Sequence, residues 1–357
     1  MKKGNDTLKI PEKNIFSLDL IEDFYSNDFT NNAFSVFKSI NNIIYIIYSN
    51  LDISIISYNL IKNEKINEIK NAHENNITNF RYYLDNFNKK ELILSISSID
   101  NNIKLWHIKN WECLYNIKNI NKYGYLYSAC ILNENNNIYI ITSNYYIFNP
   151  DPIKVFNINL DKIKEVKSIN DSYESTKFIT TYYDNKKNKN YIITGNKGYL
   201  KSYDFNSNKV YHKYNYGLGW NSGLILFFFY FYNNWIDVKN LINIFKEEDD
   251  DIIRLMESDG KGIIRIWNFH TEELLKEIII KEIRNIFGFC FWDNKYLFLG
   301  CEYNNIKLVD LKNGNIIKKL NGHEDDVICI KKIIHTIYGE CLITGDSSGI
   351  IKLWLFT

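Results

Sequence analysis

The chain has 357 residues, of which 45% are hydrophobic and 16% aromatic. This composition supplies ample apolar material for a core, and closed all-β architectures of this length fold as single domains. The 43 basic and 42 acidic residues leave a net charge of +1. That balance argues against a dominant nucleic-acid or membrane-surface role, which normally requires a basic excess.

The N-terminal segment "MKKGNDTLKIPEK" is too polar for a signal peptide. We expect residues 1–13 to form an arm. The most apolar run, Leu224–Tyr232, is far shorter than the ~20 residues that span a bilayer, and it predicts a buried strand. The six cysteines form no C-x-x-C pair, which favours reduced, buried thiols and a cytoplasmic or nuclear location. Asparagine clusters at 133–137 and 185–190 favour solvated loops over prion-like tracts.

A short segment recurs along the chain. It reads "IKLW" at 103–106 and 351–354 and "IRIW" at 264–267, with weaker copies between. The seven copies end at residues 58, 106, 156, 203, 267, 309 and 354. Successive ends are 42 to 50 residues apart, except for one interval of 64 (267 − 203). A period of about 40 to 50 residues indicates a repeat architecture.

Each unit reads as short alternating strands separated by turn residues, without a long helical pattern. Four such strands arranged radially make a propeller blade. We therefore predict an all-β, seven-bladed propeller formed as one domain by residues 1–357.

These residues resemble the WD40-repeat β-propellers, whose signature pairs an upstream Gly-His with a downstream Trp-Asp. The second unit carries the pattern most fully, with His73, Ser98, Asp100 and Trp106. The resemblance implies a structural tetrad in which the Asp orients the His and the Ser links the His to the indole N–H.

The last unit keeps His323 and Trp354, but Ser348 and Asp346 stand in exchanged places. We therefore expect a rearranged or weakened network there. His73→Ala is then predicted to cost about 1–3 kcal/mol, and His323→Ala less.

In the WD40 family, one sequence repeat supplies the outer strand of one blade and three strands of the next. The resemblance thus implies that residues 14–24 ("NIFSLDLIEDF") provide the outer strand that closes the last blade, because an unpaired edge invites aggregation.

The long interval falls in the fifth unit, where residues 233–251 form an insertion. "GLILFFFYF" reads as the first strand of this unit. Within the insertion Trp235, Val238, Leu241, Ile242 and Phe245 recur at the spacing of one helix face. We expect a short helix that either covers the propeller or docks a partner.

For function, we expect a non-catalytic scaffold in a multiprotein complex: a monomeric propeller that binds peptides or other subunits. Candidate contacts are aromatic and charged residues of the loops on the His-bearing side. They are Tyr145, Tyr146, Phe148, Trp220, Arg284, Tyr303, Glu324 and Asp325.

Other function classes have weaker support. No metal-ligand spacing, hydrolase elbow or Walker loop occurs, so we expect no enzyme activity, no cofactor and no metal. The lack of an Arg-Arg pair argues against a lipid-binding propeller. The lack of a Trp-Asp-x-Arg sequence argues against a ubiquitin-ligase substrate receptor. Both remain alternatives.

Overall fold

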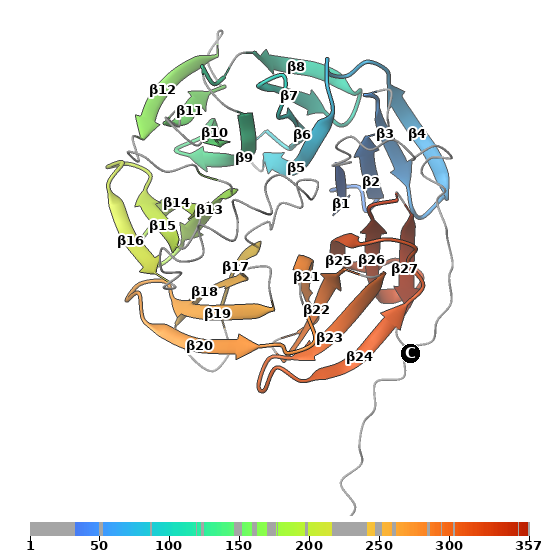
Figure 1. The fold of residues 1–357 in the computed structure, drawn as a ribbon. Helices are drawn as coiled ribbons and strands as arrows, with labels where there is room; N and C mark the ends of the chain where they lie inside the picture. Colours follow the sequence, from blue (N-terminus) through green and yellow to red (C-terminus); the bar gives the residue numbers. More distant parts are fainter. Residues whose placement is uncertain are drawn as a thin grey trace, which may run out of the picture.

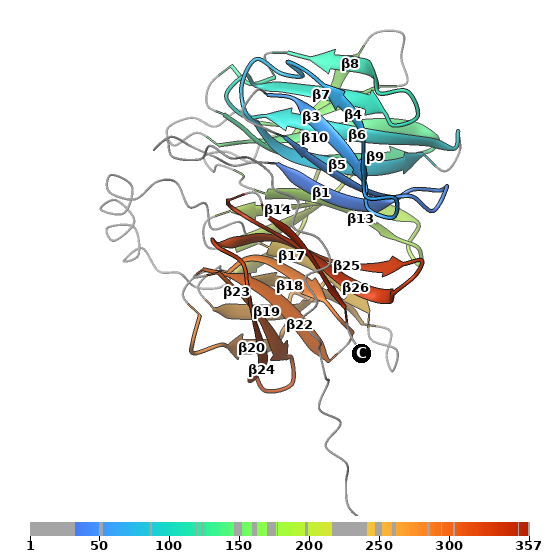
Figure 2. The same ribbon diagram turned by 90° about the vertical axis from the view of Figure 1, so that its right-hand side faces the viewer.

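The computed structural model describes residues 33–355 except 50–52, 86–87, 119, 123–124, 146–151, 159–162, 170–175, 177, 197–198, 216–240, 247–251, 259–261, 284–285, 294, 303 and 349. Seven antiparallel sheets are arranged around a common centre, and the first strand of each sheet lies closest to that centre (Figure 1). Seen from the side, blades 1 and 2 lie in the upper half of the ring and blades 5 to 7 in the lower half (Figure 2). The predicted seven-bladed, all-β propeller is confirmed at this level.

The first four blades are four-stranded sheets with the strands in sequence order from centre to rim. Blade 1 comprises β1 (Phe34–Lys38), β2 (Ile44–Ser49), β3 (Ile55–Asn59) and β4 (Glu64–Ile69). Blade 2 comprises β5 (Ile77–Asp85), β6 (Lys90–Ser97), β7 (Asn102–His107) and β8 (Glu112–Ile117). Blade 3 comprises β9 (Tyr125–Glu134), β10 (Asn137–Tyr145), β11 (Ile153–Asn157) and β12 (Lys164–Ile169). Blade 4 comprises β13 (Phe178–Asp184), β14 (Lys189–Asn196), β15 (Tyr199–Asp204) and β16 (Val210–Asn215).

The last three blades complete the ring. Blade 5 comprises β17 (Leu241–Lys246), β18 (Ile253–Ser258), β19 (Ile263–Asn268) and β20 (Leu274–Ile279). Blade 6 comprises β21 (Ile286–Phe291), β22 (Tyr296–Cys301), β23 (Asn305–Asp310) and β24 (Ile316–Asn321). Blade 7 comprises β25 (Val327–His335), β26 (Gly339–Asp346) and β27 (Ile351–Leu355).

The recurring segment found in the sequence forms the third strand of every blade. In blades 1 to 6 the pairing of the third strand with the fourth shifts register immediately before the last residue of the segment, as between Leu105 and Trp106. A register shift of this kind twists the strand locally and re-aims the side chain that follows it. The phase read from the sequence therefore corresponds to equivalent places in space.

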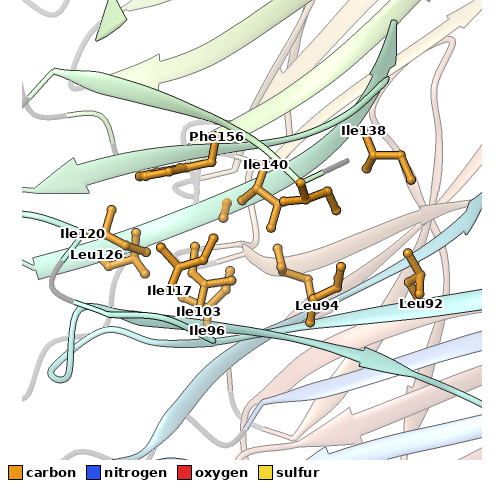
Figure 3. Packing of buried hydrophobic residues seen from close by; sticks show 13 residues of the cluster. Leu92, Leu94, Ile96, Ile103, Ile117, Ile120, Leu126, Ile138, Ile140 and Phe156 are labelled. Atoms are coloured by element: carbon orange, nitrogen blue, oxygen red, sulfur yellow. The ribbon is translucent and has the colours of Figure 1, made fainter. Parts of the chain in front are cut away.

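The hydrophobic core lies between the blades. Each pair of neighbouring blades shares one cluster of buried side chains, which gives seven clusters among the described residues. Figure 3 shows the cluster between blades 2 and 3, where Leu94 and Ile103 face Ile140 and Phe156. Both faces of each sheet are thus buried, which explains the nearly continuous apolar runs of the second strands.

Blades 1 and 7 share such a cluster, to which Ile46 and Tyr58 contribute from one side and Ile343 and Leu353 from the other. Within the described residues, β27 is the outermost strand of blade 7. The predicted closing strand, residues 14–24, and the predicted arm, residues 1–13, lie outside the described residues.

The helix predicted in the fifth unit is wrong where the structure describes it. Leu241–Lys246 is β17, the innermost strand of blade 5, and it pairs antiparallel with β18. The spacing of Leu241, Ile242 and Phe245 also fits a strand, and isoleucine favours a strand because it is β-branched. Residues 233–240 and 247–251, and the run that was predicted as the first strand of this unit, lie outside the described residues.

The asparagine clusters lie at hairpin turns, as predicted. Asn135 and Asn136 form the turn between β9 and β10 and have positive φ angles of 51° and 63°. Asn188 lies in the turn between β13 and β14 and has a φ angle of 50°. Asparagine tolerates this left-handed conformation better than most residues. Cys130, Cys301 and Cys341 are buried as expected, whereas Cys113 is exposed. No helix within the described residues is long and apolar enough to cross a membrane.

Candidate functional site

The first polar network joins the β4–β5 loop to blade 2. His73 is 3% exposed, and its Nε2 lies 2.7 Å from Ser95 Oγ. The indole Nε1–H of Trp106 donates to the same oxygen at 2.8 Å. Because an indole only donates, the Ser95 oxygen accepts from Trp106, and it therefore joins the indole to His73.

Two predicted members of this network have other roles. Ser98 does not link the histidine to the indole; its hydroxyl lies 2.9 Å from Thr78 Oγ1. Asp100 does not orient His73, because its Oδ2 accepts the backbone N–H groups of Glu74 and Asn75 at 3.0 and 2.8 Å. Within the described residues, His73 Nδ1 has no hydrogen-bond partner. Burial, followed by the charge of Lys104, lowers the pKa of His73 to about 3.

The second network, in blade 7, is complete but rearranged, which is one of the two outcomes expected for this unit. His323 Nδ1 lies 2.8 Å from Asp346 Oδ2, and its Nε2 lies 2.6 Å from Thr344 Oγ1. The indole of Trp354 donates to Thr344 at 2.8 Å. The indole only donates and the carboxylate only accepts, so His323 Nδ1 donates to Asp346, and in a neutral imidazole Nε2 then accepts from Thr344. The order of donation is indole, threonine, histidine, aspartate.

Asp346 takes the orienting role from a position two residues before Ser348. It also accepts hydrogen bonds from the Ser348 hydroxyl at 2.6 Å and from the Ile350 N–H at 2.8 Å. Burial raises the pKa of Asp346, but the hydrogen bonds from His323, Ser348 and Ile350 outweigh it and hold the pKa below its ordinary value. The exchanged residues thus rebuild the network around an ionised carboxylate.

A lysine on the third strand strengthens the same loops in four blades. Lys104 Nζ donates to the carbonyl of Ala72 at 2.6 Å, and Lys307 Nζ donates to Glu282 at 2.7 Å. Lys154 and Lys352 make the equivalent bonds to Ile120 and Gly322. Each of these four lysines therefore ties its strand to the loop that enters the same blade.

We call residues 73–76 and 323–326 the fastened loops. In the first, two backbone N–H groups bond Asp100. In the second, the Glu324 N–H reaches Asp346 at 3.3 Å and the Asp326 carbonyl accepts from Ser347 at 2.9 Å. These hydrogen bonds hold the backbone of both loops while Glu74, Glu324 and Asp325 stay exposed. The arrangement presents carboxylates on loops of fixed shape.

The other predicted contact residues are not brought into this site by the described structure. Tyr146, Phe148, Trp220, Arg284 and Tyr303 lie outside the described residues. Tyr145 is the last residue of β10, and its backbone pairs with Tyr125.

Blade 5 fills the equivalent space differently. Glu257, fully buried, occupies the place of Thr344, and Arg265 occupies the place of the motif lysine. Arg265 donates to Glu257 at 3.0 Å and to Glu277 at 2.9 Å. The indole N–H of Trp267 has no hydrogen-bond partner within the described residues. An ion pair here replaces the His–hydroxyl–Trp network.

A separate polar cluster lies between blades 4 and 5, around His270, one of the histidines that are scattered in the sequence. His270 Nε2 lies 3.2 Å from the buried Asp184 carboxylate, and its Nδ1 lies 3.1 Å from Lys187 Nζ and 3.2 Å from the Tyr211 hydroxyl. Burial and then the charge of Lys187 lower the pKa of His270. Within the part of the chain described, no three His, Cys, Asp or Glu side chains are placed to hold a metal ion.

Ser95 could have been found from register. In blade 2, Trp106 pairs with Ile93, and Ser95 follows two residues later on the same strand. In blade 7, Trp354 pairs with Leu342, and Thr344 likewise follows two residues later. Counting back from the tryptophan itself misses this correspondence, because the blade 2 turn is one residue longer. A scan against models of protein families gave no match, and a search of curated proteins gave no relative.

Proposed function

We propose that the chain is a WD40-type propeller that acts as a non-catalytic protein-binding scaffold. Two features support the WD40 assignment: the repeated phase of the motif strand in seven blades and the His–hydroxyl–Trp networks of blades 2 and 7. Rigid loops around one face of a propeller suit the binding of an extended polypeptide.

The observation that carries the proposal is the fastened loop of blade 7. Its histidine and Asp346 are buried, whereas Glu324 and Asp325 are exposed. Neither exposed carboxylate forms an ion pair within the described residues. Charge on a preorganised loop attracts an oppositely charged partner and costs little ordering entropy on binding. The partner segment we propose is therefore rich in lysine or arginine.

Affinity capture with the tagged full chain from native cells, followed by mass spectrometry, tests the proposal. The variant Glu324→Lys/Asp325→Lys should lose the captured partner, because reversing two charges at a contact opposes binding. The control variant Glu165→Lys/Glu273→Lys changes two exposed carboxylates on an outer strand and a rim turn and should retain it. Recovery of the chain alone, or equal capture by both variants, would contradict the proposed function.

A further inference from the structure

One ring of equivalent positions surrounds the axis of the propeller, on the strands closest to its centre (Figure 1). In each blade, the last residue of the motif segment pairs with a residue of the second strand, and the next residue of that strand pairs with one member of the ring. In blade 2, for example, Trp106 pairs with Ile93, and the following Leu94 pairs with Arg81. We call this set the axial ring. In blade order its residues are Ser35, Arg81, Cys130, Thr180, Asn243, Cys290 and Lys331.

The axial ring holds two cations and no carboxylate. Lys331 is exposed, and its side chain forms no hydrogen bond or ion pair within the described residues. Arg81 is half-buried, and its Nη1 donates to Asn79 Oδ1 at 2.8 Å and to the Phe80 carbonyl at 3.4 Å. Both acceptors are uncharged, so neither cation is neutralised by the described part of the chain.

The thiols of the ring do not supply the missing negative charge. Burial raises the pKa of Cys130 to about 12, even though Arg81 lies near it, and burial also raises the pKa of Cys290. Both are therefore neutral at physiological pH. Protein atoms around the Lys331 ammonium lower its pKa by partial desolvation, although the residue remains accessible to solvent, and the nearby charge of Arg81 lowers the pKa further. Each cation therefore disfavours the charge of the other.

We propose that the axial ring is an anion site that binds a phosphate group, as inorganic phosphate or as a monoester, between Arg81 and Lys331. A phosphate carries close to two negative charges, which matches the two cations. The planar guanidinium offers paired N–H donors, and the ammonium adds a compact charge. The hydroxyls of Ser35 and Thr180 occupy equivalent ring positions and add neutral donors. This site differs in place and in charge from the fastened loops.

Titration calorimetry on the full chain at low ionic strength, with inorganic phosphate and phenyl phosphate as probes, tests the site. Arg81→Gln and Lys331→Gln should each weaken binding about tenfold or more, because each removes a charged donor. Lys312→Gln is the matched control, since Lys312 is exposed on the β23–β24 turn at the rim; it should change binding less than about twofold. The tighter of the two probes identifies the source of the phosphate group.

Lys331→Gln keeps the test decisive if Arg81→Gln folds poorly, because Lys331 makes no described contact that the fold needs. Circular dichroism and melting of each variant without ligand establish that it is folded. Failure of both probes to bind the wild-type chain would overturn the proposal. Equal weakening by Lys331→Gln and Lys312→Gln would do so as well, since it would show general attraction to surface charge and not a site.

Discussion

Removing His323 should destabilise the chain more than removing His73. Both side chains are buried, so truncation to alanine leaves similar cavities, and the difference lies in the hydrogen bonds. His323→Ala removes two buried hydrogen bonds, one to Asp346 and one to Thr344, at about 1–3 kcal/mol for each, or about 2–6 kcal/mol together. His73→Ala removes one bond, to Ser95, which still accepts from Trp106. We expect about 1–2 kcal/mol there.

Equilibrium urea unfolding of the two variants measures this difference in the free energy of unfolding. Double-mutant cycles sharpen it, because His323 contacts Asp346 whereas His73 does not contact Asp100. The His323–Asp346 coupling should be about 1–3 kcal/mol, and the His73–Asp100 coupling close to zero. A larger loss for His73→Ala, or equal coupling in the two cycles, would refute the hydrogen-bond assignment in both blades.

Three further predictions follow from the same contacts. Ser95→Ala should lower the free energy of unfolding by about 1–3 kcal/mol because His73 and Trp106 lose their shared partner, whereas Ser98→Ala should change it by less than about 1 kcal/mol; urea unfolding compares the two, and equal losses would contradict the network. Arg265→Met should lower the free energy of unfolding by about 3–5 kcal/mol, because it leaves the charge of Glu257 buried beside an apolar side chain. Adding Glu257→Leu should restore most of that loss. A double variant no more stable than Arg265→Met would argue against the ion pair. The pKa of His73 falls from 6.5 to about 3 on folding, so the unfolded chain binds the extra proton and stability falls as pH drops from 6.5 toward 3. Between pH 6.5 and 5 the loss is about 2 kcal/mol, and His73→Gln, compared with wild type by unfolding at both pH values, should reduce the slope.

The architecture was predictable because its signal is repeated. Seven motif segments at a nearly constant interval set the number and phase of the blades, and the same segments form β3, β7, β11, β15, β19, β23 and β27. A degenerate copy of the motif, such as Ile306–Val309 in β23, predicts little alone. It becomes informative at the regular interval, because the core between blades requires the same apolar positions in every unit.

The hydrogen-bond partners were less predictable, because turn length changes the spacing between strands. Ser95 and Ser98 both precede Trp106, and only the pairing of β6 with β7 decides which hydroxyl reaches the indole. In blade 7, Asp346 and Ser348 exchange places, yet a carboxylate two residues earlier still reaches His323. The hydrogen-bond network therefore persists when these two residues exchange places, although a fixed sequence motif no longer matches.

The predicted helix is wrong at residues 241–246 for a related reason. Short apolar runs fit both a helix face and a strand, and periodicity alone does not separate them. Leu241–Lys246 became β17 because blade 5 needs a first strand to pair with β18. The axial ring was invisible in the sequence, since its seven members share no residue type and are equivalent only through register.

Hydrogen–deuterium exchange of the full chain, alone and bound to the partner obtained by affinity capture, tests the proposed binding face most directly. The account predicts slower exchange on binding in the fastened loops, residues 73–76 and 323–326, and no change in the β13–β14 turn around Lys186, which faces away from them. Slower exchange confined to the hairpin turns such as 184–189, with the fastened loops unchanged, would contradict it.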